Sequence, residues 1–354
     1  MYELLSFGAF LFVLAKLKEA GMPKKLARVF MLAQTLWLLL GFVAGYDFIH
    51  VEYDIFPLHI AEIIRAVNMT WIIMTLYFFA AFLAVSVLTK FKPFTKKKSV
   101  AAIILAVSVI TYSMYEAYNV RAVNVTIRTK KLPEGTQKLR IAFISDIHIG
   151  GVSTLYHLEK TMKIATDAEP DILILGGDIF DGDLSFRAKE LEVLKSAASK
   201  AKYGAFAVNG NHEHNLILDV DVEGITRECG YDLLINERRE TAGITLLGLE
   251  DVKYGWIRPY LEPEDSERFV LVVKHRPGVP NDADGRFDLQ LSGHTHGGQF
   301  WPLGYFKNMV SWSVQGLSRK SGGYVYVTNG AGFNSAMMRF LVPPEVVIVD
   351  LVRE

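Results

Sequence analysis

Cysteine is almost absent from this chain of 354 residues, which has Cys229 alone. A disulfide within the chain is therefore excluded, and we interpret the thiol as a small residue of the core, where free cysteines are usually buried. Net charge is lacking too, because 38 basic residues balance 38 acidic ones. A chain without excess positive charge has no global attraction for nucleic acid, so no nucleic-acid partner is expected. Internal repeats and low-complexity tracts are also absent.

Long hydrophobic runs, in contrast, are present and lie mainly in the first 118 residues. Hydrophobic residues make up 51% of the chain, which is high for a soluble protein. Three of the runs are long enough to cross a bilayer, which takes about 20 residues in a helix. A shorter run comes first, and we interpret it as a short span and not as a signal peptide, because its positive charges follow the apolar stretch. The predicted spans are Leu4–Leu17, Val29–Tyr46, Met69–Leu88 and Ser99–Tyr118.

Residues that build transport pathways are missing from these spans, since no charged residue lies in mid-helix and proline is absent. A transporter with a regulatory domain is therefore disfavoured. We predict that residues 1–118 form a transmembrane anchor of about four helices in the lipid bilayer, followed by a second domain over residues 119–354.

Positive charge is distributed unevenly between the connecting loops. The connection between the second and third spans has one arginine, Arg65, and several acidic residues, whereas the other two connections are rich in lysine. By the positive-inside rule both lysine-rich loops face the cytoplasm. We therefore predict a multi-pass protein of the cell membrane whose second domain, residues 119–354, is extracytoplasmic. The cations of the two loops are Lys16, Lys18, Lys24, Lys25 and Arg28, then Lys90, Lys92, Lys96, Lys97 and Lys98.

In the second domain, apolar strands alternate with amphipathic helices, which predicts an α/β sandwich with a β-rich C-terminal half. A turn at 132–137 is expected to join two early strands. The predicted helices are Thr154–Ala168, Ser185–Lys202 and Val220–Cys229. The predicted strands are Leu139–Ser145, Asp171–Gly176, Ala205–Val208, Asp232–Asn236, Ile244–Leu249, Phe269–Val273, Phe287–Leu291, Tyr324–Thr328 and Glu345–Leu351.

Five short clusters of Asp, His and Asn follow strands of this domain in a fixed order. The ends of strands are where an open α/β sheet gathers its chemistry, so we expect the clusters to meet. Together they are a candidate ligand set for two adjacent metal ions. The clusters are Asp146–His148, Gly177–Asp181, Gly210–Glu213, Lys274–His275 and Gly293–His296.

The residue types in these clusters suit metal ligation. Asp146 and His148 are two residues apart, so both can point to one side if the strand continues. Asp178 has two carboxylate oxygens and can bridge two cations, which then lie roughly 3.5–4 Å apart. Asn211 offers an amide oxygen, a ligand that adds no charge.

Other members of the clusters are suited to acid–base chemistry or to orientation. His212 is adjacent to a candidate ligand and cannot easily reach the same ion, so we expect it to act as an acid or base beside the metals. It would be held by Glu213 or by another carboxylate. Asp181 is expected to orient its loop or a neighbouring group. His294 and His296 are separated by one residue and can each serve a different ion.

In this order, the five clusters resemble the motif set of the calcineurin-like metallophosphoesterases over residues 139–351. The resemblance implies a four-layer α/β/β/α sandwich, preceded here by an all-α transmembrane domain, and a dinuclear metal centre. It also implies that Asp178 bridges the ions, and that His212 contacts the substrate phosphate and protonates the leaving oxygen. One ion would be held by Asp146, His148, Asp178 and His296, and the other by Asp178, Asn211, His275 and His294.

Two further stretches, Gly297–Gln299 and the tail from Asn329 to Glu345, resemble a membrane-anchored bacterial branch of this family. The branch is similar to phosphodiesterases and to UDP-diacylglucosamine pyrophosphatase-like enzymes. This similarity implies hydrolysis of phosphodiester or pyrophosphate bonds, including those of lipid-linked substrates, by a metal-activated hydroxide. Nitrogen and oxygen ligation without thiolate suits Mn, Fe, Zn, Ni or Co.

The sequence leaves alternatives open for the activity of the protein and for the role of one aromatic segment. A phosphomonoesterase would use the same centre, whereas a non-catalytic receptor or scaffold would use the fold for binding, and intact ligands at every matched position disfavour the latter. The aromatic segment Phe300–Trp312 is either a loop that covers the core or a lip that admits a lipid-bearing substrate.

Overall fold

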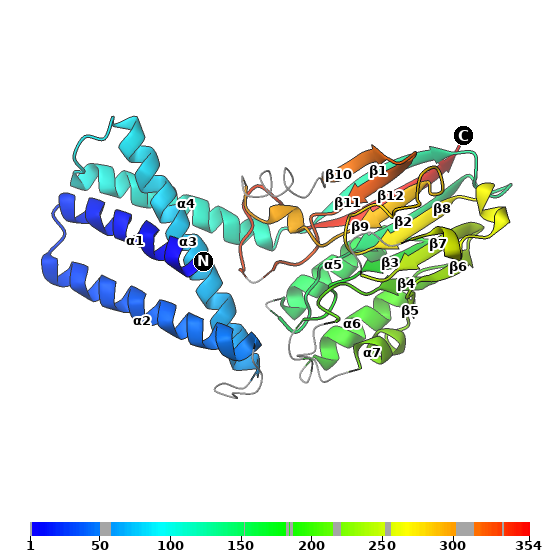
Figure 1. The fold of residues 1–354 in the computed structure, drawn as a ribbon, viewed down its shortest axis with the longest axis horizontal. Helices are drawn as coiled ribbons and strands as arrows, with labels where there is room; N and C mark the ends of the chain where they lie inside the picture. Colours follow the sequence, from blue (N-terminus) through cyan, green and yellow to red (C-terminus); the bar gives the residue numbers. More distant parts are fainter. Residues whose placement is uncertain are drawn as a thin grey trace. The chain divides into compact units, whose positions relative to one another are not determined.

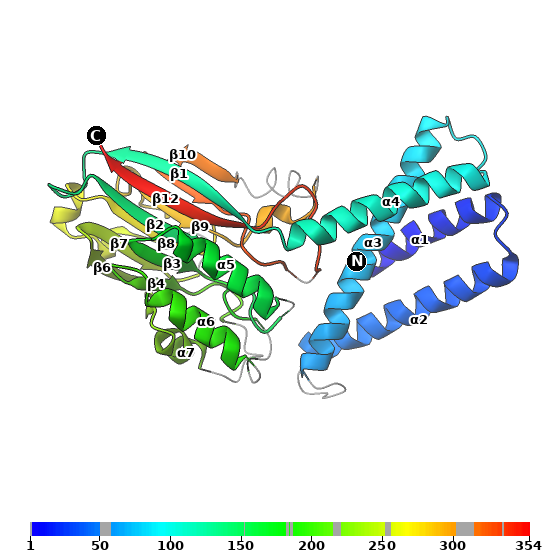
Figure 2. The ribbon, with the colours of Figure 1, turned by 180° about the vertical axis from the view of Figure 1, so that it is seen from behind.

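The computed structural model describes residues 2–49, 58–151, 153–181, 184, 187–214, 221–251, 256–301, 315–334 and 336–354. The chain forms two compact units, and each is described by itself (Figure 1 and Figure 2). The first unit comprises Met1–Tyr115 and Ser335–Phe340, and the second comprises Glu116–Asn334 and Leu341–Glu354.

Four helices build the first unit. They are α1 (Tyr2–Glu19), α2 (Lys24–Ile49), α3 (Leu58–Leu88) and α4 (Lys96–Ala117). Among the described residues, three stretches are long and apolar enough to cross a membrane, and α1 is not one of them; they are Lys24–Val43, Ile63–Leu88 and Lys96–Ala117. Large apolar side chains such as Leu36 and Phe42 are exposed on these helices, which gives them surfaces suited to contact with lipid.

The α1–α2 connection and the α3–α4 connection lie at the same end of these helices (Figure 1). The backbone N–H of Phe94 donates to the carboxylate of Glu19 at 3.1 Å. The ammonium group of Lys16 lies 5.7 Å from the centre of the Phe94 ring, and that ring stacks on Phe82 at 5.3 Å. The two lysine-rich loops are thus held on one side, which the predicted topology requires.

A short segment from far along the chain, 336–340, also belongs to the first unit. The N–H of Met337 donates to the hydroxyl of Thr70 on α3 at 3.2 Å. The ring of Phe340 makes edge contacts at 5.6 and 5.9 Å with one tyrosine of α3 and one of α4, Tyr77 and Tyr112. This packing against the helices was not predicted from the sequence.

The second unit contains two six-stranded sheets. The order in the first sheet is β1 (Arg121–Thr129), β12 (Glu345–Arg353), β2 (Lys138–Ile144), β3 (Ile172–Gly176), β4 (Ala205–Val208) and β5 (Asp232–Leu233). Strands β2 to β5 are parallel. The order in the second sheet is β10 (Gly316–Lys320), β11 (Gly323–Val327), β9 (Leu289–Ser292), β8 (Val270–Lys274), β7 (Ile244–Leu249) and β6 (Glu237–Thr241). Here β7, β8, β9 and β11 are parallel.

The two sheets pack face to face around an apolar core. Phe143 and Ile174 of the first sheet are buried there with Leu271 and Leu291 of the second. Strands β3, β7 and β8 are buried along their whole length, because both faces of each are covered. Burial on two faces explains why these strands are continuous apolar runs and not alternating ones.

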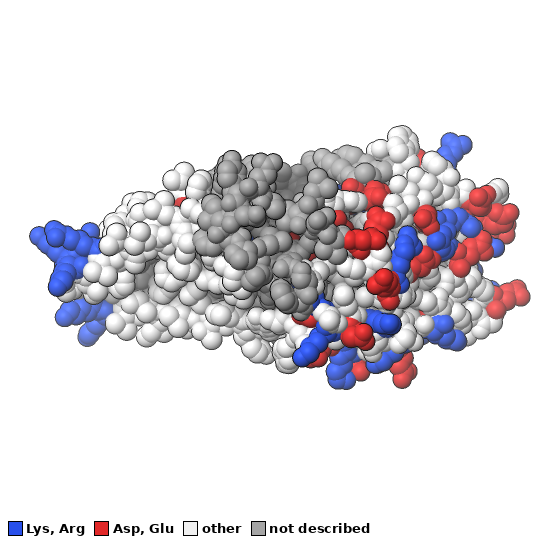
Figure 3. Space-filling model, turned by 90° about the horizontal axis from the view of Figure 1, so that it is seen from below, with Lys and Arg blue, Asp and Glu red and all other residues white. Residues whose placement is uncertain are grey.

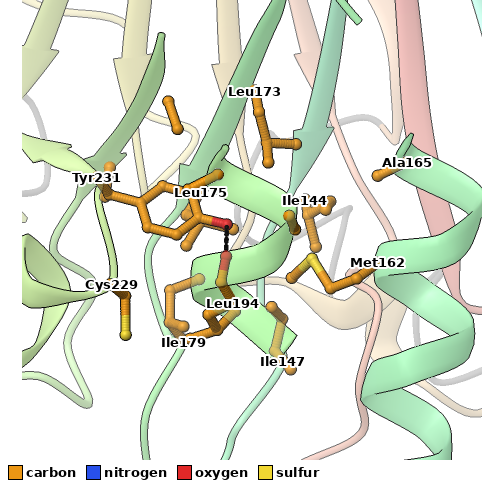
Figure 4. Packing of buried hydrophobic residues seen from close by; sticks show 14 of the residues in the cluster. Ile144, Ile147, Met162, Ala165, Leu173, Leu175, Ile179, Leu194, Cys229 and Tyr231 are labelled. Carbon is orange, nitrogen blue, oxygen red and sulfur yellow. Dashed lines mark hydrogen bonds between the residues drawn. The ribbon is translucent and has the colours of Figure 1, made fainter. Parts of the chain in front are cut away.

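Three helices cover the outer face of the first sheet: α5 (Leu155–Asp167), α6 (Ala188–Ala198) and α7 (Val222–Glu228). Helix α5 begins after Thr154, whose hydroxyl accepts the N–H of His157 and so satisfies a free donor of the first turn. Figure 4 shows Met162 of α5 and Leu194 of α6 in the apolar cluster that these helices form with the sheet. The hydroxyl of Tyr231 donates to the carbonyl of Leu194 at 3.2 Å.

The outer face of the second sheet has a thinner cover. It includes the 3-10 helices η2 (Arg258–Tyr260) and η3 (Pro263–Ser266) with neighbouring loops, and Ile257 and Phe287 are buried in this layer. The predicted α/β sandwich is therefore confirmed. In the part of the chain that the structure describes, its fourth layer is made of short 3-10 helices.

The residues that precede β1 pack within the second unit. The carboxylate of Glu116 accepts two hydrogen bonds from the guanidinium of Arg121, at 2.6 and 2.8 Å, and Val120 is buried. The ring of Tyr118 lies 5.7 and 5.5 Å from two rings of this unit, those of His157 and Phe333.

A fragment that begins at Glu116 is expected to unfold at a higher temperature than one that begins at Ala122. Loss of the buried Val120 side chain alone costs about 1.5–3 kcal/mol, and each kcal/mol shifts the midpoint by roughly 2–4 °C in a domain of this size. Differential scanning fluorimetry measures the difference, and Val120→Ala in the longer fragment should fall between the two. Equal midpoints would contradict this account of the domain start.

Candidate metal centre

The candidate ligands lie at the carboxyl ends of parallel strands in both sheets. Asp146 follows β2, Asp178 follows β3 and Asn211 follows β4 in the first sheet, while His275 follows β8 and His294 follows β9 in the second. The N–H of His294 donates to the carboxylate of Asp146 at 2.9 Å, which joins the two edges. The sheet topology thus brings clusters that are far apart in the sequence to one place.

Most of these ligands have a left-handed backbone, which costs a residue other than glycine about 1–3 kcal/mol. The φ angles are 59° for Asp146, 56° for His148, 50° for Asp178, 69° for His294 and 49° for His296. Asp146 and His148 therefore do not continue strand β2, as the sequence had suggested. Instead, their N–H groups donate to the carbonyls of Gly177 and Asp178 at 3.0 and 3.1 Å, and these bonds hold the strained turn.

Two glycines allow the backbone to approach the carboxylates closely. A Cβ atom on Gly210 would lie 2.2 Å from Oδ1 of Asp178, and one on Gly293 would lie 2.3 Å from Oδ2 of Asp146. Real Cβ atoms do not come so close, so a side chain at either position would displace the carboxylate beside it.

One group of candidate ligands consists of Asp146, His148 and His296, all buried, with ligand atoms within 4.8 Å of one another. The Nε2 atoms of His148 and His296 lie 3.0 Å apart, and Nε2 of His296 lies 3.4 Å from Oδ1 of Asp146. Three donor atoms of this kind that converge in a buried site suit a divalent metal ion.

A second group, with the same spacing limit, consists of Asp178, His275 and His294. Nε2 of His275 lies 3.0 Å from Oδ2 of Asp178. Nδ1 of the same ring lies 2.9 Å from the carbonyl of Gly176, so this nitrogen carries a hydrogen and donates it. The bond directs Nε2 of His275 into the site, as is usual for a histidine that ligates a metal.

The side chain of Asn211 is a separate indication that a cation fits here. Its Oδ1 atom is buried and accepts no hydrogen bond from the described residues. A buried amide oxygen without a donor costs about 1–3 kcal/mol, and a metal ion would remove that cost. Asn211 directly follows Gly210, the position at which an added Cβ atom would meet Asp178. The donor set therefore fits a divalent metal.

The carboxylate of Asp178 connects the groups, because it also lies with His148 and His212 in a third cluster of the same spacing. The N–H of His212 donates to its Oδ1 atom at 2.9 Å. Burial opposes ionisation of Asp178, but the charges of His275, His148 and His212 outweigh burial and hold the pKa of this carboxyl below its usual range.

Asp181 is the carboxylate that holds His212. Its Oδ1 atom lies 3.1 Å from Nδ1 of His212, and its Oδ2 atom lies 3.4 Å from Nδ1 of His148. Burial lowers the pKa of His212, but the hydrogen bond to Asp181 outweighs it and raises that pKa to about 9. The negative charge of Asp181 thus favours the protonated form of His212.

Glu213 has a different role from the one that its position next to His212 suggested. Its carboxylate accepts the N–H groups of Asp178, Ile179 and Phe180 at 2.9, 2.7 and 3.0 Å, and that of Gly210 at 2.6 Å. One side chain therefore fastens the loop after β3 to the loop after β4. Sequence reasoning missed this function, because nothing in the motif shows which backbone groups meet in space.

The predicted aromatic segment lies largely outside the described residues, which include Phe300 and Trp301 but not 302–314. Trp301 is 57% exposed and comes five residues after His296. Cys229 is buried, as predicted.

Several known proteins are similar to this chain in sequence. The model of a family described as calcineurin-like phosphoesterase matches residues 139–298. An uncharacterized metallophosphoesterase of Aquifex aeolicus is 32% identical over 260 residues, which cover 70% of this chain and 97% of that protein. A transmembrane protein with metallophosphoesterase domain of Danio rerio is 27% identical over 279 residues, which cover 72% of this chain and 63% of that protein. The uncharacterized metallophosphoesterase YkuE of Bacillus subtilis is 25% identical over 256 residues, which cover 68% of this chain and 88% of that protein.

Proposed function

Because this chain belongs to the calcineurin-like metallophosphoesterases and is a phosphoric ester hydrolase, we propose that it is a membrane-anchored enzyme with two metal ions that cleaves phosphodiester or pyrophosphate bonds. The observation that carries the proposal is the pair of three-residue ligand groups, which a third cluster links because it contains His148 of one group and Asp178 of the other. In this proposal residues 1–118 are the anchor and residues 119–354 are the catalytic domain.

Each metal would be held by residues from both sheets, with Asp178 shared between the two ions. The spacing of the ligand atoms and the buried oxygen of Asn211 support this division. The first ion would take Asp146, His148, Asp178 and His296. The second would take Asp178, Asn211, His275 and His294.

The chemistry divides between the metals and the side chains. Two ions of the Mn, Fe, Zn, Ni or Co type would neutralise the phosphoryl oxygens and supply an acidic water as nucleophile. His212 would contact the phosphate and give its proton to the leaving oxygen. Asp181 would orient His212 and favour its charged form, and Glu213 holds the loop after β3 against the loop after β4.

We further propose a lipid-linked substrate and a catalytic domain outside the cytoplasm. The apolar helices support attachment to a bilayer. The exposed indole of Trp301, close in sequence to the ligand His296, is a side chain suited to the interface between lipid and water. The two lysine-rich loops at one end of the helices support the orientation.

Asp181→Asn should move the basic limb of the kcat/KM profile to lower pH. In this proposal protonated His212 is the active acid, so activity is lost as the pH rises through its pKa, which the charge of Asp181 raises. Without the charge of Asp181 the pKa of His212 falls, and the loss begins earlier. The profile is measured on bis(p-nitrophenyl) phosphate with Mn²⁺ and full-length protein.

His212→Ala is the control for that profile. It should lower kcat by about 10²–10⁴-fold and remove the limb. An unchanged limb in Asp181→Asn would contradict the role of His212, and full activity in His212→Ala would contradict the proposed hydrolysis mechanism.

Trp301→Ala should leave hydrolysis of the soluble diester bis(p-nitrophenyl) phosphate unchanged and depress hydrolysis of a lipid-linked diphosphate by about tenfold or more, since burial of an exposed aromatic side chain by the lipid is worth about 1.5–3 kcal/mol. Trp256→Ala is a matched control, because that indole is equally exposed, at 58%, and lies elsewhere in the chain. Equal losses on both substrates would end the proposed lipid preference.

A further inference from the structure

A pocket opens at the end of the first unit, where α1 turns into α2. Its lining consists of Lys18, Lys24 and Arg28 with Ala27 and Met31. The two apolar residues are buried and half-buried and form the wall, whereas the three cations are exposed at the rim. No acidic residue lines the pocket in the part of the chain that is described.

The three rim cations have no anionic partner among the described residues, unlike other cations at this end. Lys16 pairs with Glu19 at 2.9 Å, and Lys98 donates to the carbonyl of Pro93 at 2.9 Å. Glu19 is also occupied by the N–H of Phe94. The nearby acid is therefore already engaged, and the pocket keeps its positive charge.

The start of α2 increases this charge. The helix begins at Lys24 and has no acidic residue in its first turn. The N-terminus of a helix carries a partial positive charge, which disfavours lysine and arginine and favours anions. Lys24 and Arg28 thus increase the positive electrostatic potential at the start of α2, and no acidic residue of the first turn reduces it. An anion bound between the cations would offset their mutual repulsion and interact favourably with the helix N-terminus.

The surface of α2 beyond the pocket is apolar. Residues four apart are neighbours on the surface of a helix, so Lys24, Arg28, Leu32 and Leu36 form a continuous row that winds gradually around α2. The two leucines are 62% and 57% exposed. This helix is long and apolar enough to cross a membrane over Lys24–Val43. A molecule with a phosphate at its head and long apolar chains matches this order of surfaces.

We propose that the pocket binds the headgroup of an anionic phospholipid, with the phosphate between Lys18, Lys24 and Arg28 and an acyl chain along Leu32 and Leu36. Figure 3 shows Lys and Arg side chains gathered at the left end, where the two lysine-rich loops lie in Figure 1, with no acidic side chain among them on that face. The inference rests on the proposed membrane placement and is independent of phosphoester hydrolysis.

The test uses full-length protein in nanodiscs of phosphatidylcholine with and without phosphatidylglycerol, and native mass spectrometry counts the lipids that remain bound. Wild type should retain phosphatidylglycerol in preference to phosphatidylcholine. The triple variant Lys18→Gln/Lys24→Gln/Arg28→Gln should lose roughly a hundredfold in relative affinity, because each cation near a bilayer surface contributes a factor of about five. A wild type without preference overturns the proposal, whatever the variants do.

The matched control removes three charges from the other lysine-rich loop, in Lys90→Gln/Lys92→Gln/Lys97→Gln. This variant should keep the preference. If both triple variants lose the preference for phosphatidylglycerol equally, diffuse positive charge attracts the lipid. If both keep it, the lipid does not bind in the pocket. Either result overturns the proposed site. Lys18→Arg/Lys24→Arg preserves the charge and should bind like wild type, which separates loss of charge from damage to the fold.

Inorganic phosphate distinguishes a lipid headgroup from a free anion. Phosphate is titrated calorimetrically into detergent-solubilised wild type and into the triple glutamine variant of Lys18, Lys24 and Arg28. The two proteins should bind phosphate equally, because the pocket is expected to take up a lipid and not the free anion. Binding as tight as that of a short-chain phosphatidylglycerol would assign the pocket to free phosphate. Hydrolysis of bis(p-nitrophenyl) phosphate is measured in the same samples and should be equal in wild type and variant. If wild type shows no preference for phosphatidylglycerol but still hydrolyses the diester, the lipid site is wrong and the proposed hydrolase function is unaffected.

Discussion

The buried carboxylate of Asp178 is the group on which the catalytic unit depends. An ionised carboxylate removed from water costs several kcal/mol unless charges and donors surround it. Here His275 lies 3.0 Å from one of its oxygens, and the N–H of His212 donates to the other at 2.9 Å. These partners come from different strands of the two sheets. The charge is therefore stable only where the sheets meet, and the long-range fold is what creates the site.

The strained backbone around this carboxylate is held in place by hydrogen bonds from neighbouring loops. Five of the candidate ligands have left-handed backbone, and the oxygen of Asn211 is buried without a donor among the described residues. Such features persist only when the surrounding structure holds them. Glu213 supplies much of that support, because its carboxylate collects four backbone N–H groups from two loops. In our proposal, binding of the cations offsets the free energy that this strain costs.

Much of the fold and most of the candidate ligands could be predicted from sequence, where local pattern and structure agree. Strand β4 was predicted with the bounds that it has, because it is a short apolar run between turns. Strands β6 and β10 were missed because they are the polar edges of the second sheet, where charged residues replace apolar ones. The clamp formed by Glu213 and the packing of 336–340 against α3 and α4 depend on contacts between distant segments, which no local pattern encodes.

Elemental analysis of purified full-length protein tests the central claim most directly, namely that Asp178 is shared by two metal ions. Inductively coupled plasma mass spectrometry on wild type and Asp178→Asn, both prepared with excess Mn²⁺ and then desalted, gives the number of ions per chain. The account predicts two ions in wild type and at most one in the variant, with both proteins folded as judged by circular dichroism. Equal metal content in both proteins, or a wild type without transition metal, would contradict it.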